Sequence, residues 1–297
     1  MSKGKTCPHC GEWFKPWLTQ DGSNSAELFN HTEHCPKNPR NMEKLMQLQF
    51  IGSGSAFCLD NYQSNAVLTT PSGKKILIDC GGDVRFALRD AGISILDIDA
   101  IYVSHLHGDH IHGLECVGFT TKFNPNAEKP KLFISKDMVS ALWNNALSGG
   151  MGSIQDEITK LSSFFDVHPV GKSGRFEFGG TDFQLVQVVH VFNGFAINPC
   201  YGLLFDLNGK MAFYSADTQS HPNEMKNWYA KADVVFHDCE TSPFASGVHP
   251  HYSELLKLPE ETRKKFWLYH YQDGATEAYD PVADGFKGFV AKGQIFD

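Results

Sequence analysis

Short apolar runs recur along the chain after residue 46, and turns containing glycine or proline separate most of them. Runs of this length, enriched in branched and aromatic residues, predict buried strands. Strands are expected at residues 48–56, 65–70, 75–82, 98–105, 131–135, 183–191, 201–207, 210–217, 233–239 and 265–271. The segments between them are long enough to hold helices, which favours an α/β fold.

Apolar residues spaced three or four positions apart predict helices at 83–92, 136–147, 223–232 and 252–265. The first of these ends at Gly92, a residue suited to the left-handed turn that closes a helix. The segment 148–160 begins with glycines and few apolar residues, so it is a candidate mobile lid over a site. Together these elements predict one large α/β domain over residues 45–297.

Residues 1–44 differ in composition, with four prolines and few aliphatic residues for a core. A unit this small needs a cross-link, such as a bound structural metal ion, to stabilise its fold. Cys7-x2-Cys10 followed by His31-x3-Cys35 supplies three thiolates and one imidazole, the ligands of a closed structural zinc site. His34 competes with His31 for the fourth position. We therefore expect a zinc-finger-like module in residues 1–44.

The composition restricts the partners of this chain. Its 297 residues carry a net charge of −8, which disfavours a long nucleic-acid backbone as substrate, although nucleic acid stays possible. The N-terminus lacks the apolar core of a signal peptide, and no segment is long and apolar enough for a membrane helix. The eight cysteines then indicate thiols or metal ligands in a reducing cytoplasm, with no membrane partner.

The stretch SHLHGDHIHG, residues 104–113, follows the predicted strand 98–105. On an extended segment His105 and His107 point the same way and can bind one ion. Asp109 and His110, beyond Gly108, can turn toward a second ion. Imidazole and carboxylate ligands suit Zn²⁺, and also Mn²⁺ or Fe²⁺. Two catalytic divalent metals are therefore expected, with Zn²⁺ favoured and Mn²⁺ the alternative.

This motif resembles that of the metallo-β-lactamase superfamily, and the resemblance extends over nearly everything after residue 46. FIGSGSA resembles the first strand and turn of its tRNase Z-like branch, and ILIDCGG resembles the family's strand that ends in a structural aspartate, here Asp79. The resemblance implies a four-layer αβ/βα sandwich with the metals at strand ends. It assigns His105, His107 and His190 to one ion, Asp109, His110 and His270 to the other, and Asp217 to both.

Two further segments resemble the tRNase Z-like branch. ADVVFHDCET places Asp238 where the branch has a glutamate, and GVHPHYSEL places His251 at the proton-donor position. The implied catalytic residues are thus His251, Asp238 and the ligand Asp109, with Asp238 orienting a histidine that protonates the leaving oxygen. His249 is the alternative donor and Glu240 the alternative acid, and His251 could instead cap the following helix.

The resemblance also implies a substrate. A Pro-Thr-x-x-Arg-like segment and a basic arm, typical of enzymes that process the 3′ end of tRNA, are both missing. The chain looks like the anti-Pycsar-type phosphodiesterases, homodimers that open 3′,5′-cyclic mononucleotides in immune signalling. The alternatives are an RNA 3′-processing nuclease and a metal-stabilised regulatory protein without turnover. Candidate base-stacking residues are Phe123, Trp143, Phe164, Phe165, Phe192 and Phe195.

Overall fold

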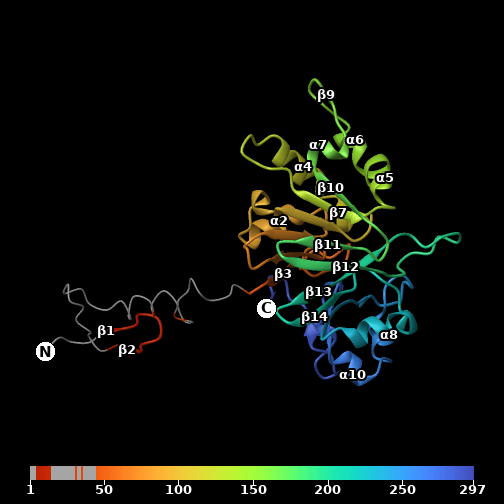
Figure 1. Cartoon of the computed structure of the whole chain (residues 1–297). Coiled ribbons are helices and arrows are strands. Elements are labelled where there is room, and N and C mark those ends of the chain that lie inside the picture. The colour runs from red at the N-terminus through yellow and green to blue at the C-terminus, as the bar shows by residue number, and fades with distance from the viewer. Residues whose placement is uncertain (1–4, 15–30, 32–34, 36–44) are drawn as a thin grey trace, which may run out of the picture. The chain divides into compact units, whose positions relative to one another are not determined.

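The computed structural model describes residues 5–14, 31, 35 and 45–297 (Figure 1). The chain divides after Lys44 into two compact units, 1–44 and 45–297. Within the first unit, two short strands, β1 (Lys5–Thr6) and β2 (Trp13–Phe14), pair in antiparallel fashion. His34, the alternative zinc ligand, lies outside the described residues.

The second unit is built on two seven-stranded sheets. The central strand β6 of the first sheet is buried along its whole length, and β13 of the second sheet is buried except at Asp206, as expected when each sheet is covered on both faces. The first sheet has the spatial order β10 (Asp166–Val170), β7 (Lys131–Ser135), β6 (Ala100–Val103), β5 (Lys75–Ile78), β4 (Asn65–Thr69), β3 (Gln47–Gly52) and β18 (Ile295–Phe296). The second has the order β11 (Arg175–Phe178), β12 (Thr181–Gln187), β13 (Tyr201–Leu207), β14 (Lys210–Tyr214), β15 (Val234–Asp238), β16 (Phe266–Tyr269) and β17 (Gly288–Phe289).

The two sheets pack face to face around a shared apolar core. Phe50 of β3 contacts Phe236 of β15, with ring centroids 5.3 Å apart. Near the other end of the interface, the Tyr102 hydroxyl of β6 donates a hydrogen bond of 2.7 Å to the carbonyl of Tyr201 in β13. Such aromatic contacts bury a large area per residue and stabilise the interface between the layers.

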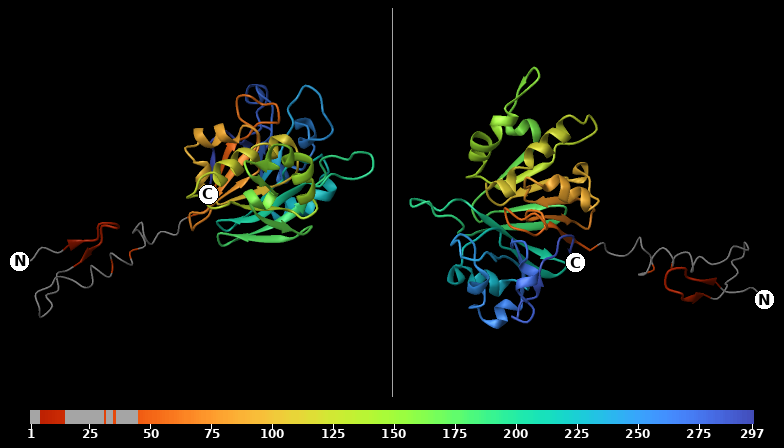
Figure 2. Two further views of the ribbon diagram at one scale, coloured as in Figure 1. Left: turned by 90° about the horizontal axis from the view of Figure 1, so that it is seen from above. Right: turned by 180° about the vertical axis from the view of Figure 1, so that it is seen from behind.

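Helices cover the outer faces of the sheets. Figures 1 and 2 show α2, α4 and α5 outside the first sheet and α8 and α10 outside the second, which gives the predicted four-layer αβ/βα sandwich. The helical segments are α2 (Val84–Asp90), η1 (Ile95–Asp97), α3 (Gly108–Ile111), α4 (Leu114–Lys122), α5 (Val139–Ala141), η2 (Leu142–Leu147), α6 (Ser148–Met151), α7 (Leu161–Phe164), α8 (Pro222–Lys231), α9 (Tyr252–Leu255), α10 (Glu260–Arg263) and α11 (Ala275–Ala278). The fold-class prediction is confirmed.

Some predicted elements differ in detail. The expected helix 252–265 is two short helices, because Pro259 has extended backbone angles and cannot continue the helix before it. The expected helix 136–147 begins at Val139 and widens into a π-helix at Leu142. Strands β10 and β11 were not expected, since DVHPV and RFEF are too short or too polar to predict a strand.

Strand direction brings the polar strand ends together. β5 and β6 run parallel, and so do β14, β15 and β16. β12 is antiparallel to β13, which is antiparallel to β14, so β12 also points the same way as β14. The carboxyl ends of these strands therefore meet at the same edge of their sheet, the usual position of ligand sites in such sheets. The residues that follow these ends form the site described next.

Candidate metal centre

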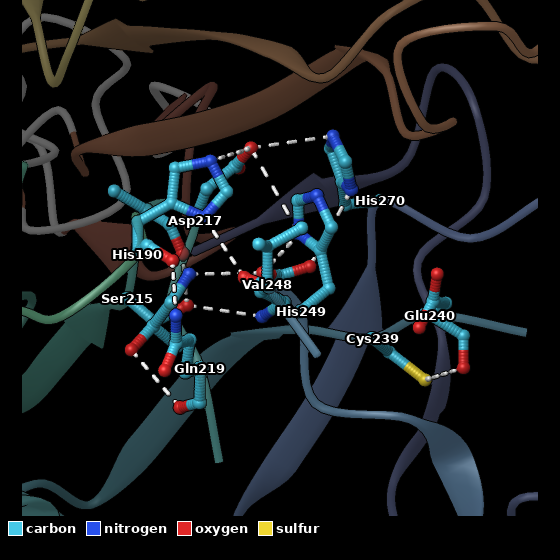
Figure 3. Close-up of polar contacts among 12 residues, drawn as sticks. His190, Ser215, Asp217, Gln219, Cys239, Glu240, Val248, His249 and His270 are labelled. Atoms are coloured by element: carbon cyan, nitrogen blue, oxygen red, sulfur yellow. Dashed lines mark hydrogen bonds and ion pairs between the residues drawn. The ribbon is translucent and has the colours of Figure 1, made fainter. Parts of the chain in front are cut away.

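Asp217, three residues beyond β14, is the hub of a buried cluster of histidines. Its Oδ2 atom lies 3.7 Å from Nε2 of His105 and 3.2 Å from Nε2 of His110. The same oxygen lies 3.8 Å from Nε2 of His190 and 3.5 Å from Nε2 of His270. Figure 3 shows Asp217 with His190, His249 and His270 around it. One carboxylate thus faces four imidazole nitrogens that come from three separate segments, the ones that follow β6, β12 and β16.

The seven residues expected as catalytic metal ligands form two adjoining groups that share Asp217. Within each group the potential ligand atoms all lie within 4.8 Å of one another. The first group is His105, His107, His190 and Asp217, and the second is Asp109, His110, Asp217 and His270. This arrangement fits two neighbouring divalent ions bridged by one carboxylate.

A hydrogen bond at the other ring nitrogen orients several of these histidines. His110 Nδ1 lies 2.8 Å from Oδ2 of Asp79, and His190 Nδ1 lies 2.9 Å from the carbonyl oxygen of Val248. Both contacts require Nδ1–H, so Nε2, which faces Asp217, is the ring nitrogen available to bind a metal. Partners of this kind are what fix the tautomer of a metal-binding histidine.

Several of the ligand atoms are buried and lack internal partners, although the His107 side chain is exposed. Within the described residues, Nε2 of His105, Nε2 of His110 and Oδ1 of Asp217 accept or donate no hydrogen bond. Buried polar atoms without partners are costly. Burial lowers the pKa of His105 well below its usual range, so this imidazole is neutral, as a metal ligand must be. The donor set therefore fits divalent metal ions.

The charges around the cluster also favour a cation. Burial opposes protonation of His110, yet the carboxylates of Asp217, Asp109 and Asp79 raise its pKa well above the usual range. The pKa of His270 is also raised, because the carboxylates of Asp217, Asp109 and Asp238 outweigh the opposing effect of burial. The cluster thus has a negative potential, and divalent cations would neutralise it.

Three residues that follow strand ends in the site have strained backbone angles. Asp79 after β5 has φ 62°, Ala216 before Asp217 has φ 53°, and His270 after β16 has φ 66°. Non-glycine residues rarely adopt positive φ, and the strain is typical of functional sites. At each position the chain turns sharply at a strand end, which directs a ligand or its hydrogen-bond partner into the cluster.

The structure places His249 beside Asp238, where His251 was expected. Asp238, the last residue of β15, is fully buried, and its Oδ2 atom lies 2.8 Å from Nδ1 of His249. The His249 ring stacks on His270, with centroids 4.6 Å apart, and Nδ1 is 4.0 Å from Asp217 Oδ2. The alternative histidine therefore stands next to the candidate metal centre (Figure 3).

The expected pairing of His251 with Asp238 is wrong. Nδ1 of His251 contacts the Ser253 hydroxyl at 2.7 Å and accepts from its backbone N–H, which caps α9. Nε2 lies 3.0 Å from the carbonyl oxygen of Ser242. The physical reason is the helix start at Tyr252, because its exposed N–H groups attract the preceding imidazole. Glu240, the alternative acid, accepts from the backbone N–H of Ser246.

A cavity of about 560 Å³ opens beside His249 and His270. Its walls include the exposed rings of Phe57 and Phe244, which sequence analysis did not single out because their loops have no periodic pattern. The expected stacking residues are elsewhere: none of the six lines this cavity, and Phe164 and Phe165 are in the core. Residues 148–160, the candidate lid, contribute nothing to its lining either.

The four expected zinc ligands of the N-terminal unit also come together. The ligand atoms of Cys7, Cys10, His31 and Cys35 all lie within 4.8 Å of one another. This second candidate metal site belongs to the unit 1–44, separate from the α/β domain.

Solved structures of low sequence identity share this fold. A diphosphatase of the PhnP family aligns with a TM-score of 0.66 and 20% identity, over 85% of this chain and 97% of its own. Human tRNase Z, short form, aligns with a TM-score of 0.61 and 16% identity, over 84% of this chain and 98% of its own. The metallo-β-lactamase fold protein YhfI from Bacillus subtilis aligns with a TM-score of 0.65 and 15% identity, over 85% of this chain and 99% of its own. These likenesses establish the metallo-β-lactamase fold. Among the described residues, no helix has the length and apolar character needed to cross a bilayer.

Sequence comparison is more specific. Residues 46–296 match the family model described as "Anti-Pycsar protein Apyc1". The protein of that name from Paenibacillus harenae is 38% identical over 231 residues, 77% of this chain and 90% of the relative. Its namesake from Bacillus phage vB_BveM-Goe7 is 33% identical over 242 residues, 78% of this chain and 91% of the relative. On this match, and with the metallo-β-lactamase fold, the chain belongs to the anti-Pycsar Apyc1 family.

Proposed function

We propose that this protein is a dinuclear metal-dependent phosphodiesterase that hydrolyses 3′,5′-cyclic mononucleotides to nucleoside monophosphates. The observation that supports this proposal most directly is the pair formed by Asp238 and His249. The pair lies beside the histidine cluster, and His249 lines the cavity that His270 also borders. A buried carboxylate that orients an imidazole is an arrangement suited to proton donation. Ring opening of a cyclic phosphodiester requires such a donor, because a ribose alkoxide is a poor leaving group.

The two ligand groups would hold the metals, with Zn²⁺ favoured and Mn²⁺ compatible. His105, His107 and His190 would bind one ion, Asp109, His110 and His270 the other, and Asp217 both. When bound, the ions supply an activated water and polarise the phosphoryl group. The protein's own contribution is to orient the ligands, chiefly through Asp79 on His110 and the Val248 carbonyl on His190.

His249 would act as the general acid. Its Nδ1–H is held by Asp238, so the transferable proton is on Nε2. In the proposed step, the oxygen of water bonds to phosphorus, the bond between phosphorus and the ribose oxygen breaks, and His249 gives its proton to that oxygen. Proton transfer from the water side then restores the imidazolium, and one water molecule is consumed per ring opened. This assigns to His249 the role that sequence analysis had given to His251.

The cavity supports a small substrate. Phe57 is 92% exposed and Phe244 73% exposed, and both rings border a space whose other end is His249 and His270. We place the nucleobase against these rings, because a base stacks on any exposed aromatic face. The net charge of −8 disfavours a long polyanion such as precursor tRNA. A cyclic mononucleotide carries a single negative charge, so its repulsion from the negatively charged protein is weaker than that of a long polyanion.

The homodimer implied by the resemblance stays a prediction. The segment between β12 and β13 exposes Phe192, Phe195 and Ile197, with Phe195 98% exposed. It extends away from the sandwich in Figure 1, and we regard it as the candidate contact between two copies. Light scattering should give twice the chain mass, and Phe195→Asp should reduce the measured mass to that of one chain.

The proposed substrate is a cytoplasmic signal, so we propose that the protein acts in the cytoplasm.

The experiment is a turnover assay on the metal-loaded full chain. The four common 3′,5′-cyclic mononucleotides and a precursor tRNA are supplied separately, and the products are separated by chromatography. We expect a nucleoside monophosphate from at least one cyclic nucleotide and no cleavage of the RNA. Cleavage of the precursor tRNA alone would replace this proposal with the RNA-processing one. Inactivity on every substrate with both ions bound would indicate a regulatory protein.

A further inference from the structure

We propose that the N-terminal unit binds one structural zinc ion through Cys7, Cys10, His31 and Cys35. This site lies outside the α/β domain and outside the residues that match the family, 46–296. It does not depend on the proposed phosphodiesterase activity. Its ligands, its geometry and its expected metal preference all differ from those of the Asp217 cluster.

The first two ligands are on a tight turn between β1 and β2. Thr6 pairs with Trp13, so the strands hold residues 7–12 as a closed loop. The Cys7 N–H donates 2.8 Å to the carbonyl of Glu12, and the Gly11 N–H donates 3.0 Å to the carbonyl of Cys7. Gly11 has φ 78°, a left-handed conformation suited to glycine. The turn therefore presents both thiols of Cys-x2-Cys on one side.

The other two ligands are brought to this turn from more than twenty residues away. His31 Nε2 lies 3.2 Å from Sγ of Cys10, and the Cys35 thiol completes the group. Cys7 is 2% exposed and Cys35 1% exposed. A unit of this size has too little apolar surface for a core of its own, so this degree of burial around polarisable ligands points to a bound ion.

The chemistry of the four ligands selects the ion. Three thiolates and one imidazole are a soft, closed set, typical of structural zinc sites without an open position for substrate. The Asp217 cluster offers only nitrogen and oxygen ligands, which also accept Mn²⁺. Zinc should therefore stay in the N-terminal site when manganese occupies the other.

A cobalt substitution separates the two sites without any activity measurement. The full chain is loaded with Co²⁺, and only a thiolate-bound ion produces the sulfur-to-cobalt charge-transfer band in the near ultraviolet. We expect that band in the natural sequence and a clear loss of its intensity, by about one third or more, in Cys7→Ser. Cys116→Ser, which removes a half-buried thiol of the α/β domain, is the matched control and should retain it. His31→Ala should shift the band, whereas His34→Ala should leave it unchanged.

A second measurement needs no variant and so does not depend on the folding of one. X-ray absorption at the zinc edge of the zinc-loaded full chain should contain a zinc–sulfur shell at about 2.3 Å. A spectrum with only nitrogen and oxygen neighbours at full zinc loading would overturn the proposal. The same conclusion would follow from a cobalt band that keeps its full intensity in Cys7→Ser. Neither result would affect the phosphodiesterase proposal, because its ligands include no sulfur.

Discussion

Asp238 Oδ2 lies 2.8 Å from His249 Nδ1, while Oδ1 of the same carboxylate lies 3.4 Å from Nδ1 of His270. One buried carboxylate thus contacts both the candidate proton donor and a candidate metal ligand. The Thr218 N–H donates 2.9 Å to Oδ2, and the Asp238 N–H donates 2.9 Å to the Ser215 hydroxyl. These bonds hold the carboxylate in place, so the position of His249 follows from the second sheet.

The first prediction separates the two histidines. His249→Ala should lower kcat by about 10²–10⁴-fold, the usual contribution of a general acid, with both catalytic metals retained. His251→Ala should instead remove a helix cap, which costs about 0.5–2 kcal/mol of stability, and change kcat little. Steady-state kinetics, metal analysis and denaturant unfolding of both variants test this. Equal losses of kcat in the two variants would contradict the assignment.

The second prediction concerns pH. Burial lowers the pKa of His249, but the Asp238 carboxylate outweighs it and the pKa is raised above the usual range. A general acid works only while protonated, so activity should fall as the pH rises through this pKa. Asp238→Asn removes the negative charge, lowers that pKa and should move the alkaline limb of kcat to lower pH. An unmoved limb in the pH profile would show that another group controls it.

The third prediction tests the orientation of His110. Its Nδ1 contacts Asp79, whose Oδ1 and Oδ2 also accept from the Ser104 N–H and hydroxyl, each at 2.8 Å. Asp79→Asn should weaken metal binding by about 10–100-fold, as loss of such a partner usually does. Competition with a chelator measures it. Asp90→Asn, which alters an exposed carboxylate bonded to Tyr62, is the control and should bind metal normally.

The fourth prediction compares two adjacent glycines. A Cβ on Gly81 would lie 2.2 Å from the carbonyl oxygen of Asp109, whereas one on Gly82 would meet nothing nearer than 3.7 Å. Gly81→Ala must displace the backbone that carries Asp109 and should cost about 1–3 kcal/mol together with metal affinity. Gly82→Ala should change neither the stability nor the metal affinity. Unfolding curves and metal titrations of the two variants test this prediction.

The fifth prediction concerns the walls of the cavity. Phe57→Ala and Phe244→Ala should each lower kcat/KM for a cyclic nucleotide by about fivefold to a hundredfold, because one aromatic stack on a base contributes about 1–3 kcal/mol. The loss should be mainly in KM and should be restored by tyrosine. Phe123→Ala, also an exposed phenylalanine but outside the cavity, should behave as the natural sequence does. A loss of kcat alone would argue against stacking.

Local pattern alone determined much of this protein. The apolar runs predicted the central strands of both sheets, and His-x-His-x-Asp-His predicted a metal centre at the end of β6, where four of the seven clustered residues lie. Cysteine spacing alone predicted the second cluster. The strands and the clustering of these residues could be predicted because strand burial and ligand spacing are properties of a few consecutive residues. His190, Asp217 and His270 came from the family resemblance, since each is a single polar residue after an apolar strand.

Only the tertiary structure decided which of two nearby histidines meets Asp238. His249 and His251 are two residues apart, and the sequence left both open as partners of Asp238. The start of α9 takes His251 as its cap, and the loop from Glu240 then turns His249 inward onto β15. The same holds for Phe57 and Phe244, which come from irregular loops on different sheets and share one cavity. Loop conformation depends on contacts between distant segments, so no short stretch of sequence contains it.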